Sequence, residues 1–292
     1  MSMKIIEVSS RSEIKKFHEL PYFIYKNDPN WIAHIKQEIE AVFTPSKNKY
    51  FKNGEAVRFL LENDKGTVIG RVAAFIDGKR AHTFTQPTGG FGFFECIDDQ
   101  QAAFMLFEAC KNWLQQKGME AMDGPINFGE KDRFWGLLVN GFDHPPIYAN
   151  SYNPSYYQSF FDNYGFQTYF NQHNFIKNLT SPMPEKYQKR CERLAKNKDY
   201  VLKSIDKKDL KKYAEDFREV YNSAWVTHDN FQGMSAEQAM AMLTKIKPVM
   251  EEDLIWFVYR DNKPISFCIM LDLPFYFLFN SFFIFLQLWE SG

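Results

Sequence analysis

A strand, one or two helices and a β-hairpin follow one another twice in this chain, and this repeated order is the strongest constraint on its fold. In the first copy, Lys4–Val8 has the pattern of a strand, and a helix is predicted to begin after Ser10. Val57–Leu61 alternates apolar and polar residues and is joined by a turn to Val68–Phe75, which predicts a hairpin. The same order recurs between residues 200 and 270. We therefore expect two copies of one structural unit.

The two copies differ after the hairpin. The first continues into a glycine-led strand over Gly89–Glu95, a helix capped by Asp98 or Asp99, and a terminating glycine at Gly118. The second ends soon after its hairpin. The expected fold is therefore mixed α/β, with a first domain that is complete and a second that is incomplete. We expect residues 1–180 to form the first domain, 181–199 a linker, 200–271 the first half of a second domain and 272–292 an atypical apolar tail.

Local signals also predict where two helices begin and end. Ser10 and Glu13 form a capping box at the start of the first helix, and Pro21 is expected to end it, since proline cannot continue the hydrogen-bond ladder. Asn153 is predicted to cap a later helix, with Pro154 at its first position. These signals define the expected boundaries of both helices.

Composition excludes several classes of function. The chain has 292 residues, is 45% hydrophobic and carries a net charge of −1, so we expect a globular protein without a nucleic-acid partner. The four cysteines are scattered, and neither they nor the six histidines have metal-ligand spacing, so no metal is expected. The first residues lack the pattern of a signal peptide, and the expected location is cytoplasmic.

Seven short strings resemble one bacterial protein family. They are Tyr25-Lys26-Asn27-Asp28-Pro29-Asn30-Trp31, Pro45-Ser46-Lys47-Asn48, Gly70-Arg71-Val72-Ala73-Ala74, Gly90-Phe91-Gly92-Phe93-Phe94-Glu95, Gly124-Pro125-Ile126-Asn127-Phe128, Gly141-Phe142-Asp143 and Tyr152-Asn153-Pro154-Ser155-Tyr156-Tyr157. The family is that of the uncharacterised GNAT-like N-acyltransferases with tandem domains. The resemblance implies a GNAT-like fold, acetyl-CoA or another acyl-CoA as co-substrate, and a small-molecule or peptide amine as acceptor. It also implies a longer protein, so the chain is expected to be truncated at its C-terminus.

The resemblance fails at the loop that binds the acyl donor. GNAT enzymes hold the pyrophosphate on a glycine-containing loop at a helix N-terminus, where backbone N–H groups favour anions. The corresponding stretch, Cys96–Ala102, has no glycine and carries two carboxylates, Asp98 and Asp99. Negative charge there opposes a pyrophosphate. We therefore assign no residue to cofactor binding, and the first domain is not expected to bind CoA in the usual way.

Glu95 is the first candidate for chemistry, because the resemblance implies a strand-ending glutamate that acts as a general base. Apolar neighbours would raise its pKa toward neutrality, whereas the alternative is an exposed acid near the helix. In the same family a tyrosine often acts as general acid at the position of Phe161, which has no proton to give. Tyr156 and Tyr157 lie one turn earlier and are candidate substitutes, with simple packing as the alternative.

A long aromatic loop, 126–151, supplies candidate substrate-binding residues, since long loops in compact domains are often functional. The alternative is a loop whose aromatic side chains pack on the sheet. The second copy adds two candidates, where such domains often contact the acceptor. The candidates are Asn127, Arg133, Trp135, Tyr148, Trp225 and His228.

The last segment, Leu273–Trp289, differs sharply in composition from the rest. Three interpretations stay open: a membrane anchor, a buried element, or sequence read out of frame. Its length reaches only the lower limit of about 17 residues for a spanning helix, and it lacks flanking lysine or arginine, so a membrane partner is not expected.

The function implied by the resemblance is transfer of an acyl group from acyl-CoA to an amine. The alternative is a non-catalytic binding or scaffold module with a degenerate acyltransferase fold.

Overall fold

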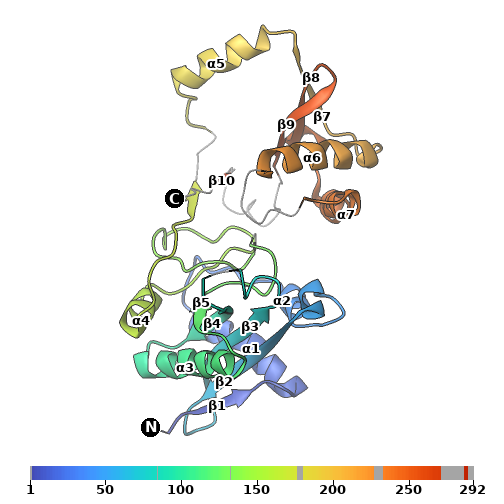
Figure 1. Cartoon of the computed structure of the whole chain (residues 1–292). Helices are drawn as coiled ribbons and strands as arrows, with labels where there is room; N and C mark the ends of the chain where they lie inside the picture. The colour runs from blue at the N-terminus through green and yellow to red at the C-terminus, as the bar shows by residue number, and fades with distance from the viewer. Residues whose placement is uncertain are drawn as a thin grey trace. The chain divides into compact units, whose positions relative to one another are not determined.

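The chain divides into two structural units in a computed structural model that describes residues 2–83, 85–131, 133–175, 180–226, 233–270 and 286–288. One unit comprises the described residues up to Gln172, and the other comprises those from His173 onward (Figure 1). Each unit has its own sheet and its own apolar core.

The first unit is built on a five-stranded mixed sheet with the strand order β1-β2-β3-β4-β5. Neighbouring strands are antiparallel except β4 and β5, which are parallel. The strands are β1 (Lys4–Glu7), β2 (Gly54–Glu62), β3 (Val68–Asp77), β4 (Thr88–Cys96) and β5 (Ala121–Asp123). The predicted hairpin is thus formed by β2 and β3, and the glycine-led strand is β4.

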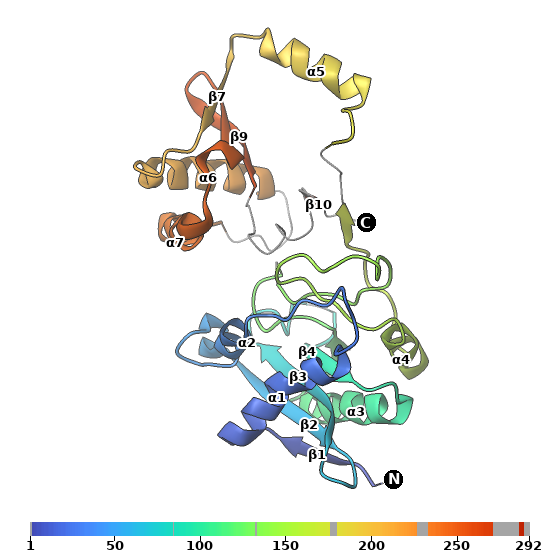
Figure 2. The same ribbon diagram turned by 180° about the vertical axis from the view of Figure 1, so that it is seen from behind.

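Helices cover both faces of this sheet. They are α1 (Arg11–Ile24), α2 (Lys36–Val42), the 3₁₀ turn η1 (Lys49–Lys52), α3 (Gln100–Gln116) and α4 (Tyr157–Tyr164). A Cβ at Gly70 would meet Leu106 of α3, whereas the next residue of β3, Arg71, contacts Phe17 of α1. Successive strand residues point to opposite faces, so α1 and α3 lie on opposite sides of the sheet, as Figures 1 and 2 show from front and back.

The main core lies between the sheet and α3. Phe107 of α3 is fully buried, and its ring centroid is 5.8 Å from that of Phe91, 4.8 Å from that of Phe94 and 4.9 Å from that of Phe161. The apolar spacing of α3 predicts this buried stripe. Its boundaries are also confirmed, because Asp99 caps its first turn and Gly118 adopts a φ of +80° after its last.

The prediction that Pro21 ends the first helix is wrong. The capping box of Ser10 and Glu13 is present, but α1 continues through Pro21 to Ile24. Proline removes the N–H that would bond to the carbonyl of Phe17, four residues earlier. Here that carbonyl accepts a hydrogen bond from Arg71 Nη1 at 2.6 Å instead. A tertiary donor therefore replaces the missing helical donor, and the helix is not interrupted.

The predicted cap at Asn153 is also wrong, since α4 begins only at Tyr157. The Asn153 side chain binds the backbone of Leu138, with Oδ1 accepting from its N–H at 2.7 Å and Nδ2 donating to its carbonyl at 3.1 Å. This asparagine therefore secures the long loop rather than the helix. The helix ends at Tyr164, and the following Gly165 adopts a left-handed φ of +106°, a common way for a helix to end.

The second unit repeats the opening of the first. A three-stranded antiparallel sheet has the order β7-β8-β9, and two helices lie in sequence between β7 and β8, as α1 and α2 lie between β1 and β2. Its elements are α5 (Glu185–Ala195), β7 (Tyr200–Ser204), α6 (Leu210–Trp225), α7 (Ala236–Ile246), η2 (Lys247–Val249), η3 (Glu252–Leu254), β8 (Ile255–Arg260) and β9 (Lys263–Ile269). A short pair, β6 (His173–Phe175) and β10 (Leu286–Leu288), is also antiparallel.

The core of the second unit joins its helices to its sheet. Phe217 of α6 and Phe257 of β8 are buried in it together with Leu243 of α7. Most of the apolar tail, residues 271–285 and 289–292, lies outside the described residues. Within the part of the chain that the structure describes, no helix combines the length and the apolar character needed to cross a membrane.

Candidate functional site

A β-bulge in β4 places Glu95 opposite Arg71. The paired residues of β3 and β4 are Arg71 with Glu95 and Ala73 with Gly92. Two residue steps on β3 thus match three on β4, and Phe93 adopts a positive φ of 52° at the irregularity. An extra residue reverses the alternation of side chains. Glu95 therefore points to the same face as Arg71, the face that α1 covers.

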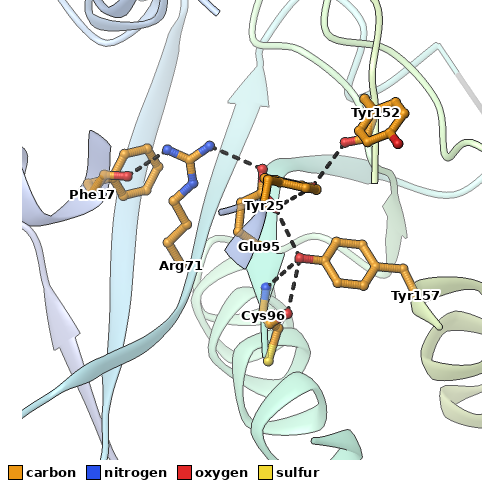
Figure 3. Close-up of polar contacts among 7 residues, drawn as sticks. All are labelled: Phe17, Tyr25, Arg71, Glu95, Cys96, Tyr152 and Tyr157. Carbon is orange, nitrogen blue, oxygen red and sulfur yellow. Dashed lines mark hydrogen bonds and ion pairs between the residues drawn. The ribbon is translucent and has the colours of Figure 1, made fainter. Parts of the chain in front are cut away.

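Three donors surround the Glu95 carboxylate (Figure 3). Tyr25 OH donates to Oε2 at 2.7 Å and Tyr157 OH donates to the same oxygen at 3.0 Å. Arg71 Nη2 lies 3.5 Å from Oε1. The Glu95 side chain is only 12% exposed, so the carboxylate lies largely inside the protein.

Burial dominates the electrostatics of this cluster. It raises the pKa of Glu95, and the nearby Arg71 charge and the two tyrosine hydrogen bonds only partly oppose that rise. Burial also raises the pKa of Tyr157 and of Tyr25 well above the usual value, so both hydroxyls keep their protons at neutral pH. The carboxylate is thus the group suited to accept a proton, and the tyrosines are donors.

The tyrosines of α4 also hold the end of β4. The Tyr157 hydroxyl accepts a hydrogen bond from the N–H of Cys96 at 2.7 Å, and Tyr156 OH donates to the carbonyl of Cys96 at 2.9 Å. Tyr157 is 1% exposed. The structure therefore brings Tyr157 into contact with Glu95 and places Tyr156 one backbone group away.

Sequence reasoning missed Tyr25 and Arg71. Both belong to strings that carry the family resemblance, but nothing in their spacing from Glu95 indicates contact. Tyr25 follows Pro21 and Phe17 at four-residue intervals, which is the one signal that these residues share a helix face. Arg71 is 3% exposed, and a buried arginine requires a partner.

The predicted substrate-binding residues of the long loop separate into two groups. Asn127 lines a small cavity with Arg80, and the Arg80 guanidinium lies 5.6 Å from the centre of the Trp135 ring. Arg133 instead lies 3.6 Å from Glu38 of α2, and Tyr148 OH donates to the same carboxylate at 2.5 Å. None of these contacts involves Glu95.

In the second unit, the ring of Trp225 lies 6.0 Å from that of Tyr221 at the end of α6. His228 lies outside the described residues. The structure therefore gives a contact for one of these two candidates only.

The N-terminus of α3 does not fit the pyrophosphate of CoA. The Asp99 carboxylate accepts the N–H of Ala102 at 3.0 Å, which uses a donor that an anion would need. Asn163 of α4 donates to Gln100 at 2.7 Å beside it. One N–H of the helix end is thus bonded to the chain's own carboxylate, which places negative charge there. Within the described residues, no three His, Cys, Asp or Glu side chains gather as a metal site.

Known proteins are similar to nearly the whole chain. No protein-family model matches it. It is 28% identical over 274 residues to a protein of Caulobacter vibrioides named bacterial ceramide synthase, which covers 92% of this chain and 70% of that protein. It is 25% identical to the Escherichia coli protein YghO over 90% of this chain and 66% of that protein. The chain thus spans about two thirds of the length of these relatives.

The order of strands and helices along the first unit is the one expected from the sequence and the family resemblance. The chain has a GNAT-like fold. Among solved structures, a tandem GNAT protein from the clavulanic acid biosynthesis pathway aligns with 91% of this chain and 73% of its own, at 10% identity and a TM-score of 0.49. The GNAT-like first unit contains the Glu95 cluster in full.

The raised pKa of Glu95 predicts that it makes stability fall as pH rises. The folded state keeps the Glu95 proton at pH values where the unfolded chain, with a carboxyl pKa of about 4.3, has lost it. Stability therefore declines from that pH up to the folded pKa of Glu95. Urea unfolding between pH 4 and pH 8 should show a smaller decline in Glu95→Gln than in the wild type. Equal pH slopes in both proteins would contradict the assignment.

Proposed function

We propose that this chain is part of an N-acyltransferase that transfers an acyl group from acyl-CoA to an amine, with Glu95 as the general base. The observation that carries the proposal is a buried carboxylate of raised pKa at the bulged end of β4 in a GNAT-like unit. The name of the Caulobacter relative supports it, because a ceramide is an amide of a long-chain amino alcohol. The proposed acceptor is therefore a small-molecule amine of that kind.

Four residues of the first unit have separate roles in the proposed proton transfer. An amine that attacks a thioester must lose a proton from its nitrogen, and Glu95 is placed to accept it. Tyr25 and Tyr157 fix the position of Oε2. Arg71 keeps a positive charge near Oε1, which limits the rise of the Glu95 pKa. A base with a pKa shifted toward neutrality can both take up and release the proton.

The acyl donor is assigned no position in the first unit. When bound, CoA supplies the activated thioester, but the N-terminus of α3 is capped by Asp99 and does not fit its pyrophosphate.

A second candidate function rests on the capped N-terminus of α3. A GNAT-like unit whose donor-binding helix end is occupied by its own carboxylate is suited to be a non-catalytic binding or scaffold module. In this case the Glu95 cluster would serve to hold α1, β4 and α4 together.

One experiment separates the two functions. The purified chain is incubated with acetyl-CoA or palmitoyl-CoA and an amine, either sphinganine or glucosamine, and thiol release and amide formation are followed. An enzyme should release thiol only when amine is present. Acyl-CoA should also raise the melting temperature, because a ligand at a concentration of 100 times its Kd stabilises the folded state by about 2.7 kcal/mol. If every pair of donor and amine gives no thiol release and no change in melting temperature, catalysis by this chain is contradicted and the scaffold function is favoured.

A further inference from the structure

Helix α1 contacts both members of the buried ion pair. Phe17, Pro21 and Tyr25 follow one another at four-residue intervals and so lie along one face of the helix. At one end, the carbonyl of Phe17 accepts from Arg71 Nη1 at 2.6 Å. At the other end, Tyr25 OH donates to Glu95 Oε2 at 2.7 Å. Figure 3 shows these contacts on the two sides of the Arg71–Glu95 pair.

Pro21 stands between these two contacts and changes the hydrogen bonding of the helix. In a regular helix, the N–H of residue 21 would bond to the carbonyl of Phe17. Proline has no N–H, so this carbonyl has no helical donor. The ladder resumes one turn later, where the N–H of Tyr25 donates to the carbonyl of Pro21 at 2.9 Å. Pro21 thus withholds a helical N–H from the carbonyl that Arg71 uses.

The position of the Arg71 guanidinium depends on that carbonyl more than on Glu95. Its hydrogen bond to Phe17 is 2.6 Å long, whereas its approach to Glu95 is 3.5 Å. Its Nε is buried without a hydrogen-bond partner among the described residues. The Phe17 ring, whose centre is 4.7 Å from Arg71 Cζ, adds a cation–π contact from the same residue.

We propose that Pro21 is a positioning residue for Glu95: by leaving the Phe17 carbonyl free of a helical donor, it fixes the Arg71 guanidinium beside the carboxylate. The role of Glu95 as a base rests on the proposed function, but the positioning itself does not. A proline inside a helix is destabilising relative to alanine, and here the carbonyl that it leaves without a helical donor binds Arg71.

Other titratable groups also face the pair and bear on its protonation. Tyr25 directly follows α1 and Tyr157 is the first residue of α4, and both donate to Glu95. Tyr156, which precedes α4, lies near the same carboxylate. Burial lowers the pKa values of His18 of α1 and of His34, which precedes α2, and the nearby Arg71 charge lowers them further. The pKa to be measured is therefore that of the Glu95 carboxyl itself, and the overall pH dependence of the protein is not a substitute for it.

The test restores the missing N–H and removes it again. In Pro21→Ala, the N–H of residue 21 returns and competes with Arg71 for the Phe17 carbonyl. We expect the pKa of Glu95 to rise, because the positive charge that lowers it is held less closely. The pKa is measured by NMR of the full chain labelled with ¹³C-glutamate, with Glu95→Gln to assign the signal. The melting temperature should rise as well, since alanine is the better helix former.

The matched control carries lactic acid at position 21, introduced as an α-hydroxy acid. It has the methyl group of alanine but an ester oxygen in place of the N–H, so the pKa of Glu95 should stay at the wild-type value. Pro21→Ser, which also restores the N–H, should behave like alanine. An unchanged pKa in both N–H variants, or an equal rise in the lactate variant, would overturn the proposal. No readout uses acyl transfer, so this result is independent of the proposed function.

Discussion

Replacing Glu95 by glutamine is expected to lower kcat/KM for acyl transfer by about 10²–10⁴-fold, the usual contribution of a positioned general base. Glutamine keeps the size of the side chain and still accepts hydrogen bonds from Tyr25 and Tyr157, but it cannot take up the proton of the amine. The rate is measured as thiol release from acyl-CoA with a fixed amine, across pH 6 to 9. The acidic limb of the pH profile should be lost in the variant.

Glu108→Gln is the matched control for this experiment. Glu108 lies on α3, where its carboxylate accepts from Tyr164 OH at 2.6 Å, and its side chain is 46% exposed. This variant should keep wild-type activity. Full activity in Glu95→Gln, with circular dichroism showing both variants folded, would exclude Glu95 as the base.

Replacing Arg71 by methionine is expected to destabilise the fold by about 3–5 kcal/mol, the usual result of removing one partner of a buried ion pair. The Arg71 side chain is 4% exposed. Its loss leaves two buried acceptors short of a donor: the Glu95 carboxylate and the carbonyl of Phe17. Urea unfolding at pH 7 measures the change.

The double variant Arg71→Met, Glu95→Gln tests the cause of this destabilisation. Removing the second charge should recover part of the lost stability, because no unpaired carboxylate then stays buried. If the double variant loses the full sum of the two single losses, the ion pair does not account for the effect of Arg71→Met.

Local signals in the sequence predict most of the secondary structure. Some features depend only on residues that are close in sequence and can therefore be predicted from short strings. They are the β2–β3 hairpin, the cap at Asp99 and the left-handed Gly165. The repeat of strand, helices and hairpin in the second unit is readable for the same reason. Glu95 is recognisable because it stands at the end of a strand that a family resemblance picks out.

The rest of the site depends on contacts between distant parts of the chain. The bulge that turns Glu95 toward Arg71 is a matter of register between β3 and β4, which no short string encodes. Tyr25 reaches Glu95 only because α1 packs on that face of the sheet.

Both wrong helix boundaries have the same physical cause. In each case a distant partner changes the outcome. Arg71 donates to the carbonyl that Pro21 leaves without a helical donor. The backbone of Leu138 binds the Asn153 side chain that was expected to cap the helix.

The carboxylate that caps α3 also has a practical consequence for the design of inhibitors. Compounds that imitate a nucleotide diphosphate depend on an open, positively polarised helix end, and in the first unit Asp99 already occupies that end. We therefore expect such compounds to bind this unit weakly.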